Sequence, residues 1–228
     1  MAYRAASLLP AKGAVILMYH SVSENRKLFT VTPDDFARQM RYLYEQKFFV
    51  LNLEDAVSHM QKNSLSQKTV VVTFDDGYKD NYSNAFPILK QYRFPATIFV
   101  SKQAEESDAL SEQEMREMVR SGLITFGSHA HHHVKLPQLS DTEIETELAA
   151  SKKILENITG KNVHTLAYPF GSYDKRVKSI AAKYYRIACA VHKGRMSVSS
   201  DMLALPRNSI DSEVTFTQFK GIARFGRL

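Results

Sequence analysis

The sequence predicts an α/β fold in which about seven parallel strands and their helices form a distorted (β/α) barrel. Short apolar segments alternate with amphipathic helical patterns along the chain. Most of these segments are hydrophobic throughout, as expected when helices cover a parallel sheet. No glycine-rich phosphate loop follows any of them, which favours a closed or partly closed barrel over an open dinucleotide-binding sheet.

The predicted strands are short runs rich in apolar and β-branched residues. They cover residues 15–19, 70–74, 97–100, 124–127, 165–168 and 187–191, with 203–205 as a further candidate. No repeat, low-complexity tract or linker divides the chain. We therefore expect a single domain over residues 1–228, with its core between about 14 and 210.

Several of the predicted helices show their ends in the sequence. A Ser or Thr with Glu three positions later is a capping box, Pro is favoured at the first helical position, and Gly often ends a helix. These features are Thr32 before Pro33, Ser111 with Glu114, and Ser140 with Glu143 and a final Gly160. Apolar stripes at helical spacing follow each start, and we interpret them as core faces.

The composition excludes several classes of protein. The net charge of +6 indicates a solvated basic surface, since no basic run interleaved with aromatics suggests a nucleic-acid groove. No apolar stretch is long enough to span a membrane. A single cysteine, Cys189, lies in an apolar run, so we expect a buried structural thiol and no intrachain disulfide.

The apolar run at residues 14–19 resembles a buried first strand more than a signal peptide. This interpretation predicts a cytoplasmic protein if the chain is complete, and a cell-envelope or extracellular one if a leader was removed. The oligomeric state stays open.

Two carboxylates follow the predicted strand at 70–74. Asp75 and Asp76 are adjacent, and like charges at close range repel and resist desolvation. A bound cation would hold one carboxylate as a ligand and leave the other free to take a proton. Asp-Asp-Gly is also a common turn sequence, so the pair alone leaves a plain turn as an alternative.

Four histidines occur within five residues after the predicted strand at 124–127. They are His129, His131, His132 and His133. Imidazoles and a carboxylate are the usual ligands of a catalytic zinc ion, although a solvated polar turn is the alternative interpretation. A third strand end carries Phe170 between a proline and a glycine, where a backbone N–H could stabilise an oxyanion.

Three segments together resemble the polysaccharide deacetylase family, also called the NodB-homology domain, over roughly residues 14–210. They are TFDDG at 73–77, SHAHHH at 128–133 and YPFG at 168–171. The resemblance implies that Asp75 is the general base and that the Phe170 amide completes an oxyanion hole. It also implies a divalent metal, most commonly zinc, held by Asp76, His129 and His133. The four-residue spacing in the family selects His133 over His132.

The sequence departs from the family pattern at three places. Ala130 stands where Ser or Thr is usual, and Ala167 stands where an arginine often orients the base. The late leucine-histidine motif that supplies the general acid is absent. Either the acid has been lost, or His20 at the end of the first strand takes this role, as the resemblance to poly-β-1,6-N-acetylglucosamine deacetylases implies. Arg207 could approach Asp75 and replace the missing arginine.

The resemblance implies a hydrolase that removes N-acetyl groups from an N-acetylglucosamine-containing polysaccharide or oligosaccharide and releases acetate. Tyr78 and Tyr173 lie near motif ends and could stack on sugar rings, with core packing as the alternative. Two other functions remain open: hydrolysis of small cyclic amides at the same site, and a non-catalytic glycan-binding module. The linkage and length of the glycan are not predicted.

Overall fold

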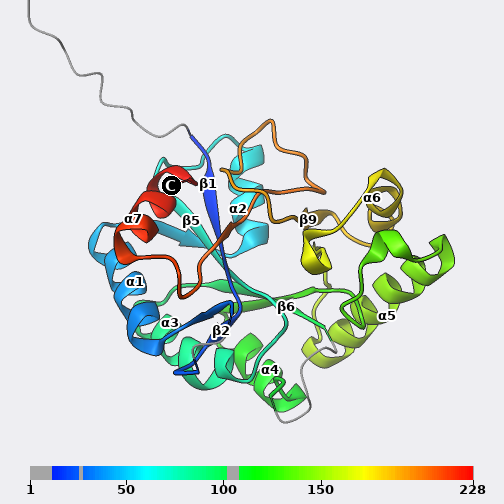
Figure 1. Cartoon of the computed structure of the whole chain (residues 1–228), viewed down its shortest axis with the longest axis horizontal. Coiled ribbons are helices and arrows are strands. Elements are labelled where there is room, and N and C mark those ends of the chain that lie inside the picture. The colour runs from blue at the N-terminus through cyan, green and yellow to red at the C-terminus, as the bar shows by residue number, and fades with distance from the viewer. Residues whose placement is uncertain (1–11, 26–27, 102–107, 228) are drawn as a thin grey trace, which may run out of the picture.

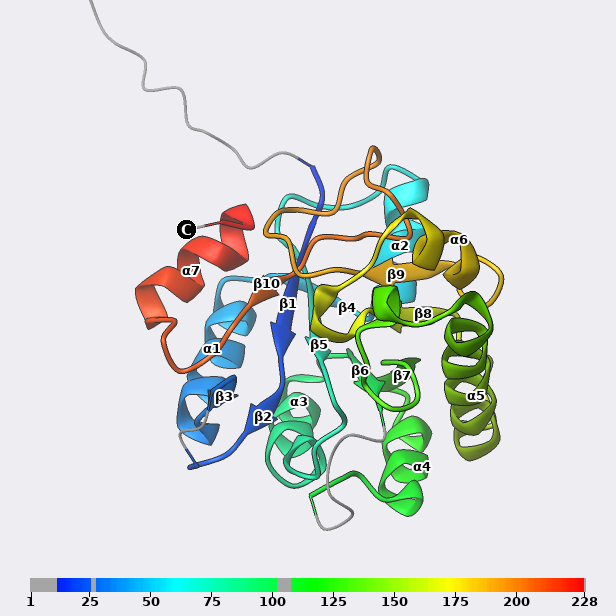
Figure 2. The ribbon, with the colours of Figure 1, turned by 45° about the vertical axis from the view of Figure 1, so that its right-hand side comes forward.

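The structure is a computed structural model that describes residues 12–25, 28–101 and 108–227. Its main sheet is entirely parallel and strongly curled into a half-barrel, with the order β10-β1-β5-β6-β7-β8-β9 (Figures 1 and 2). The bounds of these strands are β1 Ala14–Tyr19, β5 Thr69–Phe74, β6 Ala96–Val100, β7 Ile124–Ser128, β8 Thr165–Ala167, β9 Ile187–Cys189 and β10 Asn208–Ser209. The predicted fold class is confirmed.

Three short strands complete the sheets. β4 (Phe49–Leu51) pairs with the beginning of β5, whereas β6 pairs with its end. β2 (Ser21–Val22) and β3 (Thr30–Val31) form a separate parallel pair after β1. None of these three strands is predicted from the sequence, because each is defined by its pairing with a neighbouring strand and shows no pattern of its own.

The helices lie around the curled sheet (Figure 1). They are α1 Pro33–Glu45, α2 Leu53–Gln61, α3 Phe86–Tyr92, α4 Glu112–Arg120, α5 Asp141–Thr159, α6 Lys175–Ala181 and α7 Phe216–Phe225, with a π-helical turn at Asn81–Ala85 before α3. Thr32 caps α1, and the predicted capping boxes of Ser111 and Ser140 are present. Gly160 ends α5 in the left-handed conformation, as predicted. No helix in the described part of the chain is long and apolar enough to cross a membrane.

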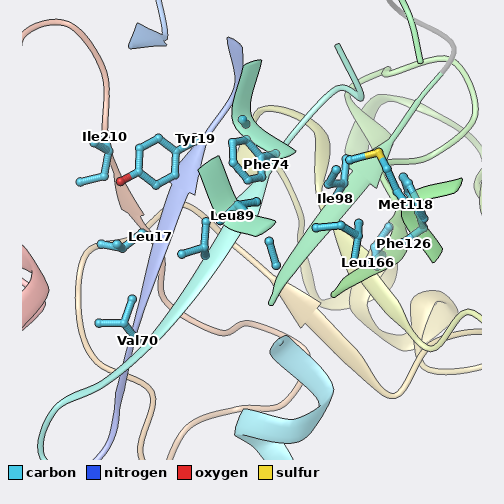
Figure 3. Packing of buried hydrophobic residues seen from close by; sticks show 14 of the residues in the cluster. Leu17, Tyr19, Val70, Phe74, Leu89, Ile98, Met118, Phe126, Leu166 and Ile210 are labelled. Carbon is cyan, nitrogen blue, oxygen red and sulfur yellow. The ribbon is translucent and has the colours of Figure 1, made fainter. Parts of the chain in front are cut away.

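The apolar strands are buried on both faces. Side chains alternate across β1, so that Leu17 and Tyr19 belong to a large cluster with the outer helices, whereas Ile16 belongs to a smaller one with α2. Figure 3 shows Leu17, Tyr19 and Phe74 within the larger cluster, among the labelled residues of neighbouring strands. Burial on both faces explains why these strands are apolar throughout.

Residues 205–209 run between the two ends of the sheet. Leu205 forms an isolated parallel bridge with Cys189 of β9, and Asn208 of β10 pairs with Leu17 of β1. The candidate strand at 203–205 is therefore wrong: only Leu205 pairs, and Pro206 follows it without an N–H to donate. This segment carries the buried Arg207 between the first and last strands.

Candidate active site

All three motifs continue the pairing of neighbouring strands, the third through the Tyr168 amide, which donates to the Cys189 carbonyl at 3.1 Å. The Asp75 amide donates to the Tyr19 carbonyl at 2.9 Å, continuing the pairing of β5 with β1. The His129 amide donates to the Val100 carbonyl at 3.0 Å, continuing the pairing of β7 with β6. Because all these strands are parallel, all three motifs leave the sheet at its carboxyl edge, where catalytic groups of such folds gather.

The backbone turns sharply after Asp75. Asp76 has φ of 72° and Gly77 has φ of 75°, both in the left-handed region. Aspartate tolerates this conformation better than most residues, and glycine adopts it without a steric cost. A Cβ on Gly77 would also lie 3.1 Å from the Val100 side chain. The tight turn leaves the two adjacent carboxylates with different partners.

Asp76, His129 and His133 converge on one point. Asp76 Oδ1 lies 3.6 Å from His129 Nε2 and 3.5 Å from His133 Nε2, and the three candidate ligand atoms lie within 4.8 Å of one another. The Asp76 oxygen is buried and has no hydrogen-bond partner. Distances of this size are long for hydrogen bonds and suit atoms that share a metal ion. The three residues therefore fit a divalent metal.

The protonation states of the histidines also suit a metal. His129 Nδ1 lies 2.7 Å from the Ala167 carbonyl, which can only accept, so Nδ1 carries the proton and Nε2 is free to bind a cation. Burial lowers the pKa of His129 to about 4, and it also lowers the pKa of His133. Both imidazoles are therefore neutral near pH 7, the form in which histidine binds metals.

Among the described residues, no Lys or Arg forms an ion pair with the Asp76 carboxylate, whose close neighbours are His129 and His133. Burial, and next the charge of Asp75, raise the pKa of Asp76 to about 7. An ionised carboxylate is costly in such a place unless a cation binds beside it.

Asp75 is paired with a guanidinium group. Arg207 Nη1 and Nη2 donate to the two Asp75 oxygens at 2.6 and 2.7 Å, and Arg207 Nε donates to the Ala190 carbonyl at 3.0 Å. Burial alone would raise the pKa of Asp75, but the charge of Arg207 and its two hydrogen bonds hold it well below its usual range. Asp75 is therefore ionised at neutral pH, beside the three candidate metal ligands.

His20 lies in the same region. It lines a cavity of about 390 Å³ together with Asp76 and Tyr78. Its ring stacks on Phe29 at 4.9 Å between centroids, and its Nδ1 is buried without a hydrogen-bond partner. Burial lowers the pKa of His20, and the charge of Asp75 partly opposes this shift.

The other predicted residues have distinct surroundings. Phe170, with φ of 58°, is 56% exposed, and its ring lies 4.5 Å from that of His133. Tyr78 interacts with Asp76 through its side chain. Tyr173 stacks on Tyr168 at 4.7 Å and packs against the core, and it does not line the cavity described above.

Glu147 of α5 was not among the predicted site residues, although the sequence contains one sign of its role. Glu147 is buried in the same helix face as Ile144, Leu148 and Leu155. A charged residue in the middle of an apolar stripe is unusual and calls for a buried partner. That partner is the histidine-rich turn, since His132 Nδ1 lies 2.6 Å from Glu147 Oε1.

Comparisons with known proteins define the class. A family model described as polysaccharide deacetylase matches residues 62–186, and the chain belongs to this family. YxkH of Bacillus subtilis is 34% identical over 213 residues, which cover 92% of this chain and 75% of that protein.

Two further relatives carry more specific names. The poly-β-1,6-N-acetyl-D-glucosamine N-deacetylase of Staphylococcus aureus is 28% identical, with 86% of this chain and 73% of that protein covered. The structure of the Streptococcus pyogenes deacetylase PplD in complex with acetate is 29% identical, covers 93% of this chain and 98% of that one, and has a TM-score of 0.85.

Proposed function

We propose that this protein is a metal-dependent hydrolase that removes N-acetyl groups from an N-acetylglucosamine-containing glycan and releases acetate. The observation that carries the proposal is the convergence of Asp76, His129 and His133 beside an ionised Asp75. The relative from Staphylococcus aureus, named for deacetylating poly-β-1,6-N-acetyl-D-glucosamine, supports an acetylated glycan as the substrate.

Asp76, His129 and His133 would hold the metal, most commonly zinc in this kind of site. When bound, such an ion would polarise the acetyl carbonyl and make a water molecule more acidic. Asp75 accepts a proton from the attacking water. A carboxylate has about four lone-pair sites, so the two bonds from Arg207 leave acceptor capacity on Asp75.

Arg207 orients the base and keeps it ionised. The Phe170 amide donates to the carbonyl oxygen as negative charge develops on it. The protonated form of His20 then gives its proton to the amide nitrogen while the C–N bond breaks, because an unprotonated amine is a very poor leaving group, and the imidazole is left neutral. Water is consumed, and the products are acetate and a free amino sugar. Tyr78, which lines the cavity, contacts the sugar beside the reacting group, whereas Tyr173 fits the alternative of core packing.

The test is acetate release from defined oligomers of N-acetylglucosamine with β-1,6 or β-1,4 linkages, measured with and without a chelator. We expect release from at least one series, loss of release on chelation, and recovery when zinc is added back. A small cyclic amide is assayed in parallel. Hydrolysis of the cyclic amide without acetate release from any oligomer would refute the glycan assignment, and no hydrolysis by the zinc-loaded protein would favour a non-catalytic module.

A further inference from the structure

The turn that joins the two metal-binding histidines is strained. Ala130 has φ of 57° and His133 has φ of 54°, and neither is a glycine. A left-handed backbone is unfavourable for such residues and persists only where surrounding contacts impose it. The turn brings the rings of His129 and His133 to 4.8 Å between centroids. Whatever imposes this turn therefore also sets the spacing of two metal ligands.

One carboxylate on α5 supplies these contacts. Glu147 Oε2 accepts hydrogen bonds from the backbone amides of His131 and His132 at 2.9 and 2.8 Å. The other oxygen, Oε1, lies 2.6 Å from His132 Nδ1. Glu147 is only 9% exposed, and a carboxylate at this depth is tolerated because several donors surround it.

Ser151, a second residue on the same face of α5, holds the start of the turn through Ser128. Ser128 Oγ donates to Ser151 Oγ at 2.8 Å and accepts from the Ala130 amide at 3.1 Å. Glu147 and Ser151 are four positions apart, so they lie on one face of α5. All three amides between the ligand histidines thus have a partner. Because the Ala130 methyl group can neither donate nor accept a hydrogen bond, the turn depends on the contacts from Ser128 and from Glu147 of α5.

We propose that Glu147 is a positioning residue for the metal centre. Its carboxylate fixes the turn so that His129 and His133 meet the ion without a reorganisation cost. The proposal rests on the metal-binding part of the proposed function and is independent of the substrate. It predicts that changes at Glu147 weaken metal binding by a folded protein, whereas a merely structural residue would alter unfolding and leave metal affinity unchanged.

The experiment compares four purified variants with the wild type: Glu147→Ala, Glu147→Gln, His132→Ala and Glu145→Gln. Zinc affinity is measured by chelator competition, and the coordination geometry by the visible absorption spectrum of the cobalt-loaded protein. Circular dichroism of each metal-free variant confirms that it is folded. Glu145 is the matched control, because it lies on the same helix and pairs with Lys183 outside the site.

We expect Glu147→Ala to lose about 10- to 100-fold in zinc affinity, the usual range for residues that orient metal ligands, and to change the cobalt spectrum. Glu147→Gln keeps an oxygen for the two amides and should lose less. His132→Ala removes one of the three contacts and should lose least, and Glu145→Gln should match the wild type.

A folded Glu147→Ala variant with wild-type zinc affinity and cobalt spectrum would overturn the proposal. If that variant does not fold, unchanged affinity in both Glu147→Gln and His132→Ala overturns it. A wild-type protein that binds neither zinc nor cobalt would instead refute the metal part of the proposed function.

Discussion

Asp75 and Asp76 are neighbours in the chain, yet their carboxylates lie in opposite electrostatic surroundings. Asp75 faces the guanidinium of Arg207, which holds its pKa well below the usual range. Asp76 faces two neutral imidazoles, and its pKa rises to about 7. The left-handed turn at Asp76 separates the two surroundings within one peptide unit.

The difference shows how one dipeptide can provide two chemical roles. A carboxylate with a permanent cationic partner stays ionised whatever else is bound, which suits a base. A buried carboxylate without one is costly to ionise until a cation arrives, which suits a metal ligand. Arg207 therefore differentiates the two residues, although it lies 132 positions from Asp75 in the sequence.

The sharpest test of this division exchanges each carboxylate for an amide. In Asp75→Asn we expect turnover to fall on the order of 10⁴-fold, because the base is lost, while bound zinc stays near the wild-type level. In Asp76→Asn we expect the zinc itself to be lost, and activity with it. Acetate release and metal content, measured on the same samples, check both.

Circular dichroism serves as the control for both variants, because Asp75→Asn leaves Arg207 buried without its ionic partner. Loss of zinc from Asp75→Asn, together with retention by Asp76→Asn, would reverse the two assignments.

Removal of Arg207 should cost the most stability. Arg207→Met leaves a fully buried Asp75 carboxylate unpaired, and breaking such a pair typically costs about 3–5 kcal/mol. The free energy of unfolding in urea, measured with chelator present, gives the change. The double variant Arg207→Met/Asp75→Asn should lose less than the two single variants combined, because it leaves neither charge behind.

Lys178→Met is the matched control, since Lys178 forms an ion pair with Asp201 at the surface and should matter little. Equal losses in Arg207→Met and Lys178→Met would contradict a special role for the buried pair.

Much of the fold could be predicted because its physical causes are local. Strand β1 is apolar throughout, β5 is centred on a run of three valines, and Ser111 and Ser140 mark helix starts in the sequence. The candidate metal ligands Asp76, His129 and His133 were expected from motifs at strand ends and from the histidine spacing of the family, and the structure brings these three residues together. β4 and β10 could not be predicted, since they are defined by their neighbours and not by a period of their own.

The contacts that hold the site are harder to predict than the site itself. Arg207 was expected to approach Asp75 only by analogy, since its position depends on how residues 205–209 cross between the ends of the sheet. Glu147 escaped notice because only the folded chain brings α5 against the histidine-rich turn. Pairings across distant elements depend on geometry that no local pattern records.

The stability of the metal-free protein should reveal the raised pKa of Asp76. Folded Asp76, with a pKa of about 7 against the ordinary 3.8, holds its proton more tightly than the unfolded chain does. Its contribution to stability is therefore full below pH 4 and declines as the pH rises through 7, by up to roughly 4 kcal/mol.

The measurement is the free energy of unfolding of the wild type minus that of Asp76→Asn, in chelator, across this range. The difference should fall with rising pH, and saturating zinc should restore wild-type stability above pH 7 by binding the folded state. If the difference in unfolding free energy between the wild type and Asp76→Asn does not change from pH 4 to 7, the pKa of Asp76 is not raised in the folded protein.

His20 lies near both carboxylates. It lines the cavity together with Asp76, and the charge of Asp75 raises its pKa against the effect of burial. If it donates the proton to the leaving nitrogen, His20→Ala should slow hydrolysis of an acetamide by about 10²-fold. Hydrolysis of an activated acetyl ester should change little, because that leaving group needs no proton. His59→Ala on α2 is the control, since it removes a histidine from outside the site. An equal loss on both substrates would make His20 a residue that shapes the cavity, whereas loss on the acetamide alone requires a proton donor.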